Sequence, residues 1–377
     1  MVNKKFWLGM LTMVLVFGMS VVGCDDDSTN DPTNDPTNDP IEDPLKAGLY
    51  LKSPPISAND TPIAEVNAND IAAAITYVNA NPETYTLLID NDVDLEPQEL
   101  NKANVKLTII GIGKERKIKL SQNGLMFSIG KSEQTGIEFT LGNNITLVGR
   151  SSSGNGNENN NDCVVNIDNG SSFTMLNGSK VTGNTCSVDP ASTSYLSAAV
   201  YVMGSSNFTL KGGTITGNAI SGATSSQPAS GGLYVGTGCS VILEGGSITG
   251  STGGIGDVLL NPAVTSFTLS KTSVVGELTM STGSATASTI TITVTQDWTG
   301  NVSKLNFRGG SATMATAVSY WEGRTILKGD SLTTANVNKF TLGNFISSAT
   351  SYNTAAINAT HKIENSGANI GKLVKNQ

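Results

Sequence analysis

The acidic residues are the first place to look for chemistry, because two carboxylates that converge on one face of a protein can hydrolyse a glycosidic bond. Asp168, Glu244 and Asp257 lie in similar stretches of the chain, but each occupies a different position within its stretch. Stacking those stretches would therefore not bring the three carboxylates together. The densest acidic run, at 90–96, stands before these stretches and is typical of a solvated turn.

Histidine and cysteine chemistry is equally sparse. His361 is the single histidine, which argues against histidine-ligated metals and histidine acid–base catalysis. Apart from Cys24, the chain has Cys163, Cys186 and Cys239, and this odd number leaves at least one thiol without an intramolecular partner. We expect buried or turn cysteines, with an intramolecular disulfide as the alternative. The sequence predicts no catalytic residue, no cofactor and no metal.

The elements that would carry any site come from a repeated phrase. FTMLNGSKVTGN at 173–184 returns as FTLKGGTITGN at 208–218 and as VILEGGSITGS at 241–251. Apolar residues alternate within each copy and glycine or serine corners follow, which predicts short strands that recur every 33–35 residues. No copy could bury its apolar side alone. Stacked copies would place equivalent positions above one another in continuous internal columns.

Alignment of the copies predicts which residues stack. Two columns are expected to point inward: Val165, Val200, Leu233 and Val258 in one, and Phe173, Phe208, Val241 and Phe267 in the other. Thr209 is expected to point outward. Lys211 and Glu244 occupy equivalent positions and are expected to form an ion pair on the outer surface.

Two further segments are predicted to close the ends of these columns. Asp70 precedes apolar residues at helical spacing and Pro82 follows them, so a short helix is expected over 70–80. This helix would cover the N-terminal end. Residues 361–374 are expected to form a terminal hairpin or cap, because exposed strand edges invite aggregation.

One outward position carries a candidate binding feature. Between the two inward residues of one strand lie Asn166, Tyr201 and Tyr234 in successive copies. Two exposed aromatic rings on neighbouring strands would suit a sugar ring or a protein surface, although tyrosine is also simply a good strand residue. We expect any ligand on the flank that bears Tyr201 and Tyr234, and the loops at 183–199 and 217–232 are the next candidates.

The N-terminus has the parts of an export signal, namely two lysines, an apolar run and small residues before Cys24. The ending Val21-Val22-Gly23-Cys24 resembles the bacterial lipoprotein box. The resemblance implies that residues 1–23 are removed and that Cys24 is acylated, and several acyl chains on one residue anchor stably. The alternative is a single membrane helix, because residues 6–23 contain no charge.

The segment that follows, 24–44, is acidic and rich in proline. It repeats Thr-Asn-Asp-Pro three times and contains eight acidic residues and no basic one. Such a segment repels itself and favours extended geometry, so we expect a spacer, with an acidic Ca²⁺ site as the alternative. Since the whole chain has a net charge of −8, the remainder is nearly neutral. It lacks the basic stripe that nucleic acid requires.

A family resemblance rests on these phrases. The run TLGNNITLVGR at 140–150, followed by FTMLNGSKVTGN and GGLYVGTGCSVILEGGSITG, resembles right-handed parallel β-helix proteins. Residues 45–377 together with the lipoprotein box are similar to the repetitive β-helix surface lipoproteins of spirochaete-type bacteria. The resemblance implies an all-β, pectate-lyase-like fold, a right-handed parallel β-helix or solenoid with a short N-terminal capping helix. The function of that family is largely uncharacterised.

The expected organisation is a signal peptide at 1–23, a lipidated tether at 24–44, a capped β-helix at 45–284 and a C-terminal β continuation or cap at 285–377. An independent small β-domain at 285–377 is the alternative. The expected function is a non-enzymatic, membrane-anchored protein that adheres to, or displays a surface to, glycans or host or matrix proteins. The alternative is a polysaccharide lyase or glycoside hydrolase, although the Gly-His-Gly and Arg-Ile-Lys elements of polygalacturonases are absent from the sequence.

The expected partners and location follow from the same features. Membrane lipid would be bound through acylated Cys24, and nucleic acid is not expected as a partner. The protein is expected to be exported and anchored to a bacterial membrane, at the outer membrane or cell surface. The sequence does not identify the ligand or the oligomeric state.

Overall fold

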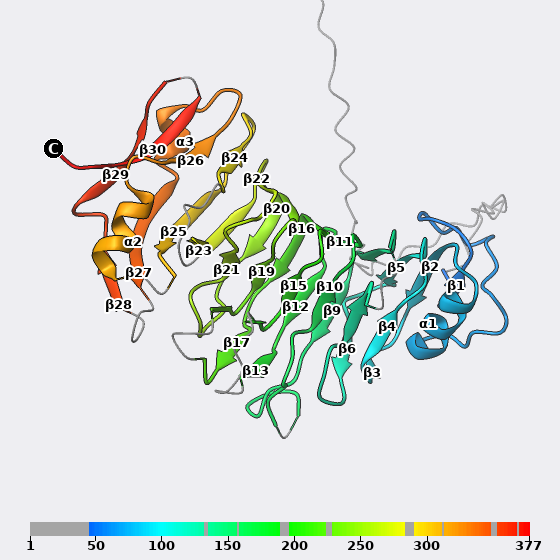
Figure 1. Ribbon diagram of the computed structural model, residues 1–377. Helices are drawn as coiled ribbons and strands as arrows, with labels where there is room; N and C mark the ends of the chain where they lie inside the picture. The colour runs from blue at the N-terminus through cyan, green and yellow to red at the C-terminus, as the bar shows by residue number, and fades with distance from the viewer. Residues whose placement is uncertain are drawn as a thin grey trace, which may run out of the picture. The chain divides into compact units, whose positions relative to one another are not determined.

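A computed structural model describes residues 45–377, except 132–134, 157, 189–195, 224–227, 283–289, 311–312, 348–352 and 368. The expected signal peptide, Cys24 and the tether lie outside the described residues. Residues 43–377 form one compact unit. Strands dominate this unit, and 26 of those described belong to one sheet in which most neighbouring strands are parallel (Figure 1). The chain is mostly β, as the sequence predicts.

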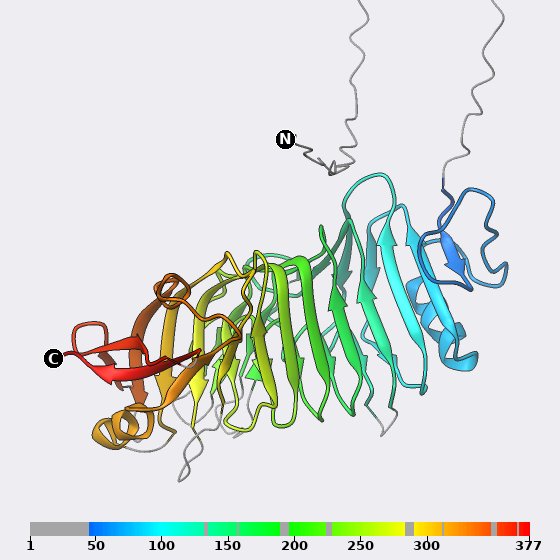
Figure 2. The ribbon, with the colours of Figure 1, turned by 90° about the horizontal axis from the view of Figure 1, so that it is seen from above.

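Parallel pairing arranges the strands of the sheet in three ladders. Ladder A contains β2 (Thr84–Ile89), β5 (Lys106–Gly111), β8 (Glu138–Leu141), β11 (Ser172–Met175), the first halves of β16 (Asn207–Ile215) and β20 (Ser240–Ile248), β22 (Ser266–Leu269), β24 (Ile292–Val294) and β26 (Thr325–Lys328). Figure 2 shows successive strands side by side, coloured from cyan through green to yellow.

Ladders B and C follow in each unit of the chain. Ladder B contains β3 (Val93–Leu95), β6 (Arg116–Leu120), β9 (Ile145–Val148), β12 (Lys180–Thr182), the second halves of β16 and β20, and the first halves of β23 (Val274–Ser281), β25 (Asn301–Arg308) and β27 (Phe340–Ser347). Ladder C contains β4 (Gln98–Leu100), β7 (Phe127–Ile129), β10 (Val165–Ile167), β15 (Val200–Val202), β19 (Leu233–Val235), β21 (Val258–Leu260) and the second halves of β23, β25 and β27.

The predicted internal columns are confirmed. In ladder A, Phe173 pairs with Phe208, Phe208 with Val241, and Val241 with Phe267. All four side chains are buried, and the rings of Phe173 and Phe208 lie 5.6 Å apart between centroids. In ladder C the column Val165, Val200, Leu233 and Val258 forms in the expected register. Each strand therefore contributes alternate apolar side chains to one continuous core.

A helix and one antiparallel strand lie at the N-terminal end of the ladders. Helix α1 (Ile71–Ala80) confirms the predicted segment, and the Asp70 carboxylate caps it by accepting the Ala73 N–H at 2.9 Å. The Asn79 side chain of α1 donates to the Glu99 carbonyl and accepts the Asn101 N–H, so it occupies hydrogen-bonding groups at the edge of β4. Strand β1 (Gly48–Tyr50) pairs antiparallel with β2.

The C-terminal region continues the ladders and then reverses. Strands β24 and β25 pair in parallel with β22 and β23, so the ladders run on past residue 285. Antiparallel strands then close them: β28 (Asn353–Ala356) pairs with β27, and β30 (Ile370–Lys375) pairs with β26. Strands β29 (His361–Asn365) and β30 form the predicted hairpin. Two short helices accompany them, α2 (Met314–Trp321) and α3 (Thr334–Val337).

The long connections between ladders B and C form small sheets of their own. Strand β13 (Thr185–Ser187) pairs with β17 (Ala219–Ser221), and β14 (Leu196–Ser197) pairs with β18 (Ala229–Ser230). A separate small cluster that includes Cys186, Val188 and Ile220 packs between them. The loops at 183–199 and 217–232 therefore contain short paired strands of their own.

Candidate binding faces

The tyrosine pair predicted from the sequence forms on the outer side of ladder C. Tyr201 pairs with Tyr234 in the parallel register, and the two rings are stacked with centroids 4.8 Å apart and planes at 22°. Neighbouring strands of a sheet lie at about this spacing, so the ladder itself dictates the stack. The expected geometry of the pair is present.

The expected exposure of the pair is wrong. Only 2% of Tyr234 is exposed, and Tyr201 is half-buried. Tyr234 packs with Ile255, Leu259 and Ile346 in a cluster outside the main core, and its hydroxyl accepts a hydrogen bond of 2.9 Å from the Asn261 amide. The two rings therefore belong to a second packed layer, and Tyr234 does not face solvent.

The same covering extends along most of the outer position of ladder C. Apart from Tyr201 and Glu99, which are half-buried, the residues aligned with Tyr234 are nine-tenths buried or more: Ser128, Asn166, Leu259, Thr279 and Asn306. One covering contact is explicit, because the Thr279 hydroxyl donates to the carbonyl of Ile255 in the corner before β21. Side chains that point outward from these strands are therefore mostly buried inside the protein.

Ladder A presents the opposite arrangement. Its central outward position holds a column of β-branched residues in register, which we call the threonine column: Thr108, Thr140, Thr174, Thr209, Ile242, Thr268 and Thr293. Ile242 is 42% exposed, and the threonines are half-buried by their neighbours in the column. Within the described part of the chain, no hydrogen bond occupies the hydroxyls of these threonines. Ladder A thus offers an open face of repeated hydroxyl and methyl groups.

No protein-family model matches the chain, and neither the curated proteins nor the solved structures searched contain a match.

The carboxylates compared in the sequence lie apart in the ladders. Glu244 follows the ladder A part of β20 and forms an ion pair with Lys271 at 2.7 Å. The expected pair between Lys211 and Glu244 is wrong, because the register shifts after Leu210 and Lys211 aligns with Gly245. The carboxylate of Asp168, just after β10, accepts the N–H of the next residue at 2.7 Å. Each of these carboxylates serves a local contact.

Asp257 has a structural partner that the sequence did not indicate. Its two carboxylate oxygens accept backbone N–H groups from Ser251 at 2.7 Å and from Glu277 at 2.9 Å. Burial raises the pKa of Asp257, and the nearby Glu277 adds to the effect. A Cβ on Gly276 would lie 2.3 Å from one of these oxygens, so a glycine there permits the contact. Since Asp257 is 5% exposed and both oxygens are used, it holds the corner before β21 in place.

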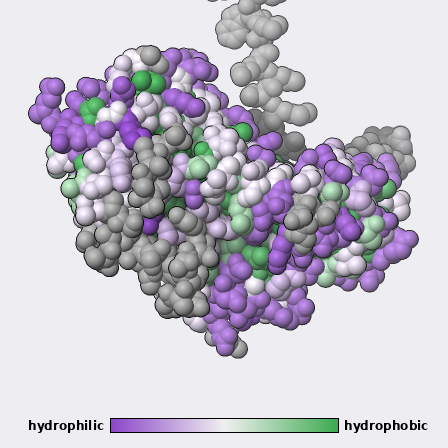
Figure 3. Space-filling model, in the orientation of Figure 1, coloured by the Kyte–Doolittle hydropathy of each residue, from purple (hydrophilic) through white to green (hydrophobic). Residues whose placement is uncertain are grey.

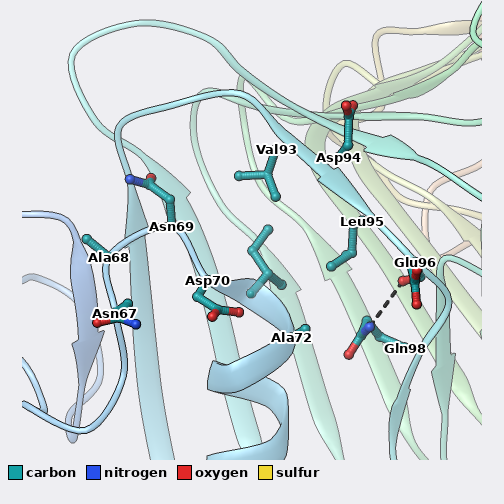
Figure 4. Close-up of a pocket in the computed structure, with 11 residues that line it drawn as sticks. Asn67, Ala68, Asn69, Asp70, Ala72, Val93, Asp94, Leu95, Glu96 and Gln98 are labelled. Atoms are coloured by element: carbon teal, nitrogen blue, oxygen red, sulfur yellow. Dashed lines mark hydrogen bonds between the residues drawn. The ribbon is translucent and has the colours of Figure 1, made fainter.

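The acidic run at 90–96 lies beside a hollow of about 490 Å³ at the start of α1 (Figure 4). Its carboxylates bind separate partners: Asp90 accepts from the Asn69 amide, Asp92 from the Lys117 N–H and Glu96 from the Gln122 amide. In Figure 4 the Asp94 side chain points away from the other labelled residues. Within the described residues, no three His, Cys, Asp or Glu side chains are grouped so that they could hold a metal ion. The predicted turn is therefore only partly correct, because strand β3 runs through this acidic segment, and three of its carboxylates serve hydrogen bonds.

The three cysteines that follow Cys24 are free and buried, as expected for structural thiols. Burial raises the pKa of Cys163 and Cys239 and that of Cys186 to about 12, so these thiols stay protonated and unreactive at neutral pH. His361 is also buried, with its edge against the ring of Phe345. These groups contribute to packing.

Large hydrophobic residues are seldom exposed in the described part of the molecule. No helix among the described residues is both long enough and apolar enough to cross a membrane. Figure 3 shows one face of the molecule, on which hydrophobic residues occur in small separate groups among hydrophilic ones. The large hydrophobic residues that are exposed in the described part are Leu45, Leu51 and Ile242. Of these, Ile242 lies in a ladder strand, between Thr209 and Thr268 in the threonine column.

The threonine column is the feature that sequence reasoning missed, although its signal is present. The dipeptide Phe-Thr, followed by Leu or Met, recurs in ladder A at 139–140, 173–174, 208–209 and 267–268, and once more in ladder B at 340–341. Its apolar residues identified the core, and Thr209 was recognised only as an outward residue. Reading the intervening residues as a column of their own would have found the open face.

Proposed function

We propose that the ladders form a right-handed parallel β-helix. Each successive unit of the chain contributes a strand to ladder A, then to B, then to C, and pairs in parallel with the next unit. This order recurs from β2 to β27. Parallel strands in one sheet are joined by right-handed crossovers in about 98% of cases, which supports the handedness.

We further propose that the protein is a non-enzymatic, lipid-anchored binding protein that displays this solenoid at a bacterial surface. The open outer face of ladder A carries the proposal: one side-chain type recurs in register over successive strands, and its hydroxyls make no hydrogen bonds to other described residues. Folding does not require a threonine at every outward position, because many residues suit a strand surface. A repeated surface suits a ligand that is itself repetitive, such as a glycan or an extended polypeptide.

The anchor in this proposal is Cys24, joined to the solenoid by the acidic segment 25–44. The sequence supports it through the lipoprotein box, and the apolar run ahead of it supplies the export signal. Cys24→Ser is expected to leave an uncleaved or soluble chain that no longer enters the detergent phase with lipoproteins. Unchanged partitioning of this variant would overturn the anchor.

Display and binding are tested together on cells. Proteolysis of intact cells should remove the wild-type protein if it is displayed. The full-length, detergent-solubilised chain should bind members of a glycan and matrix-protein array and should not degrade a panel of polysaccharides. Protection on intact cells together with turnover of a polysaccharide would reject this function in favour of a lyase or hydrolase.

A further inference from the structure

The structure contains one example of a polypeptide bound to the outer face of ladder A. The Thr86 hydroxyl of β2 occupies the position that begins the threonine column, and it donates to the Lys52 carbonyl at 2.8 Å. Thr86 is fully buried by this contact. The same N-terminal segment places Tyr50 and Ile56 against Leu88 of β2. The chain itself therefore shows how a backbone carbonyl and apolar side chains occupy this face.

Beyond β2 the same position is open. Thr108 pairs with Thr86, so the threonine column continues directly from the covered residue. From Thr108 to Thr293 the column crosses six steps between strands, about 29 Å at roughly 4.8 Å a step. The hydroxyls along it have the chemistry of Thr86 without the Lys52 carbonyl. The open column is thus a continuation of an internal contact surface.

We propose that the threonine column binds an extended polypeptide of another protein in the polyproline II conformation. This inference rests on the proposed binding function and names its partner. The carbonyls of the peptide would accept hydrogen bonds from the threonine hydroxyls, as the Lys52 carbonyl does from Thr86. A polyproline II chain makes no internal backbone hydrogen bonds, so its carbonyls are available along its whole length.

The spacing of the column favours this conformation over a β-strand. A polyproline II helix rises about 3.1 Å per residue with three residues per turn, and therefore repeats about every 9.3 Å. Two steps of ladder A measure about 9.6 Å, so one carbonyl per turn would meet every second residue of the column. A β-strand repeats about every 6.7 Å, which matches neither one step nor two. About nine residues of peptide would cover the column.

The charges beside the column favour a partner of low charge. Lys106 and Glu138 form an ion pair at 2.7 Å at one end, and Lys271 and Glu244 form another further along. Lys211 and Lys328, which aligns with Thr293 at the end of the column, are both exposed and leave a small positive excess. A strongly basic peptide would be repelled, and a strongly acidic one would find little to bind. The exposed Ile242 side chain, between Thr209 and Thr268 in the column, would contact proline rings of the peptide.

Fluorescence anisotropy with a labelled acetyl-(Pro-Pro-Ser)₄-amide peptide tests the proposal on the full-length, detergent-solubilised chain. The test variant combines Thr140→Val and Thr209→Val, which lie two steps apart in the column, keep the side-chain shape and remove two hydroxyls. The control combines Thr182→Val and Thr216→Val, at and just beyond the ends of the ladder B strands. Two lost hydrogen bonds should weaken binding about fivefold to a hundredfold, while the control should bind as the wild type does.

Two outcomes would overturn the inference. Equal losses in the test and control variants would show that the peptide binds elsewhere. Failure of the wild type to bind the peptide, while it still binds a glycan on the array, would reject the polypeptide partner and leave the proposed binding function intact. Failure to bind any array member would reject the proposed function as well.

Discussion

The outer faces of ladders A and C are built from strands in the same way but differ in their exposure to solvent. Both consist of parallel strands whose middle residue points away from the core, yet Thr209 on ladder A is accessible and Tyr234 on ladder C is buried. Other segments of the chain cover ladder C: the cluster of Tyr234 includes Ile255 in the corner before β21 and Ile346 in β27, and the Thr279 hydroxyl donates to the Ile255 carbonyl. On ladder A, by contrast, Ile242 is 42% exposed. A second packed layer thus changes what an outward side chain must be.

The largest expected effect is a loss of stability when the buried tyrosine ring on the outer face of ladder C is removed. Tyr234→Ala should lower the free energy of unfolding by about 3–5 kcal/mol, as Phe208→Ala in the internal column should, because each removes a buried aromatic ring. Denaturant melts of the two variants measure both values. A loss at Tyr234 below about 0.5 kcal/mol would mean that its ring behaves as a surface side chain, and the contrast between the two faces would disappear.

A second test loosens the covering layer without touching the tyrosines. Asp257→Ala removes the acceptor of two backbone N–H groups that hold the corner before β21, so we expect a loss of about 2–4 kcal/mol. The corner includes Ile255, which packs on Tyr234, so hydrogen exchange at the amides of 251–256 should also quicken. Glu244→Ala, a carboxylate on the open face of ladder A, is the matched control and should leave exchange in this corner unchanged. If hydrogen exchange were equal in the two variants, Asp257 would not be what holds the covering layer in place.

A third test uses pH at the far end of ladder C. His361 packs edge-on against Phe345, and burial lowers its pKa, with Lys375 lowering it further and Glu322 opposing the shift. Because the unfolded chain then takes up the proton first, stability should fall as the pH drops below about 6.5 and should level off below the folded pKa. Melting temperatures from pH 7.5 to 5 measure the loss, and His361→Phe should remove that part of it. An identical pH profile for the variant would assign the loss to other groups.

The smallest expected effect lies on the open face. Thr209→Ala should change the free energy of unfolding by less than about 0.5 kcal/mol, since the hydroxyl makes no hydrogen bond within the described residues. The measurement is the same denaturant melt that gives the large loss for its neighbour Phe208. A loss comparable to that of Phe208→Ala would show that the assignment of inward and outward residues in β16 is wrong.

The repeat allowed much of the ladder structure to be predicted. Alternation at Phe208 and Leu210 identifies inward residues, and the spacing of the copies aligns them with Phe173 and Val241, because parallel stacking preserves position within each unit. The capping helix could be predicted equally well, since Asp70 and the apolar spacing after it are local signals. Such features depend on residues close in sequence or related by one period.

The environment of Tyr234 could not be predicted in the same way. Tyr234 belongs to a cluster that also contains Ile255 in a corner and Ile346, more than a hundred residues later in sequence, and neither belongs to the aligned phrases. The partner of Glu244 was missed for a related reason, because an irregularity after Leu210 shifts the alignment of Lys211 by one residue. Periodicity therefore predicts which side chains stack, and contacts between non-repeated segments decide which of the others reach solvent.

The pairing of the end strands affects how copies of the protein behave when they are crowded together. A stack of parallel strands ends in rows of unpaired N–H and C=O groups, which can recruit another molecule and lengthen into a fibre. Here β1 pairs with β2, Asn79 of α1 occupies the edge of β4, and β28 and β30 reverse direction to pair with β27 and β26. Reversal breaks the parallel continuation that end-to-end growth would need. Molecules held close together can thus remain separate, with contact between them left to their side chains.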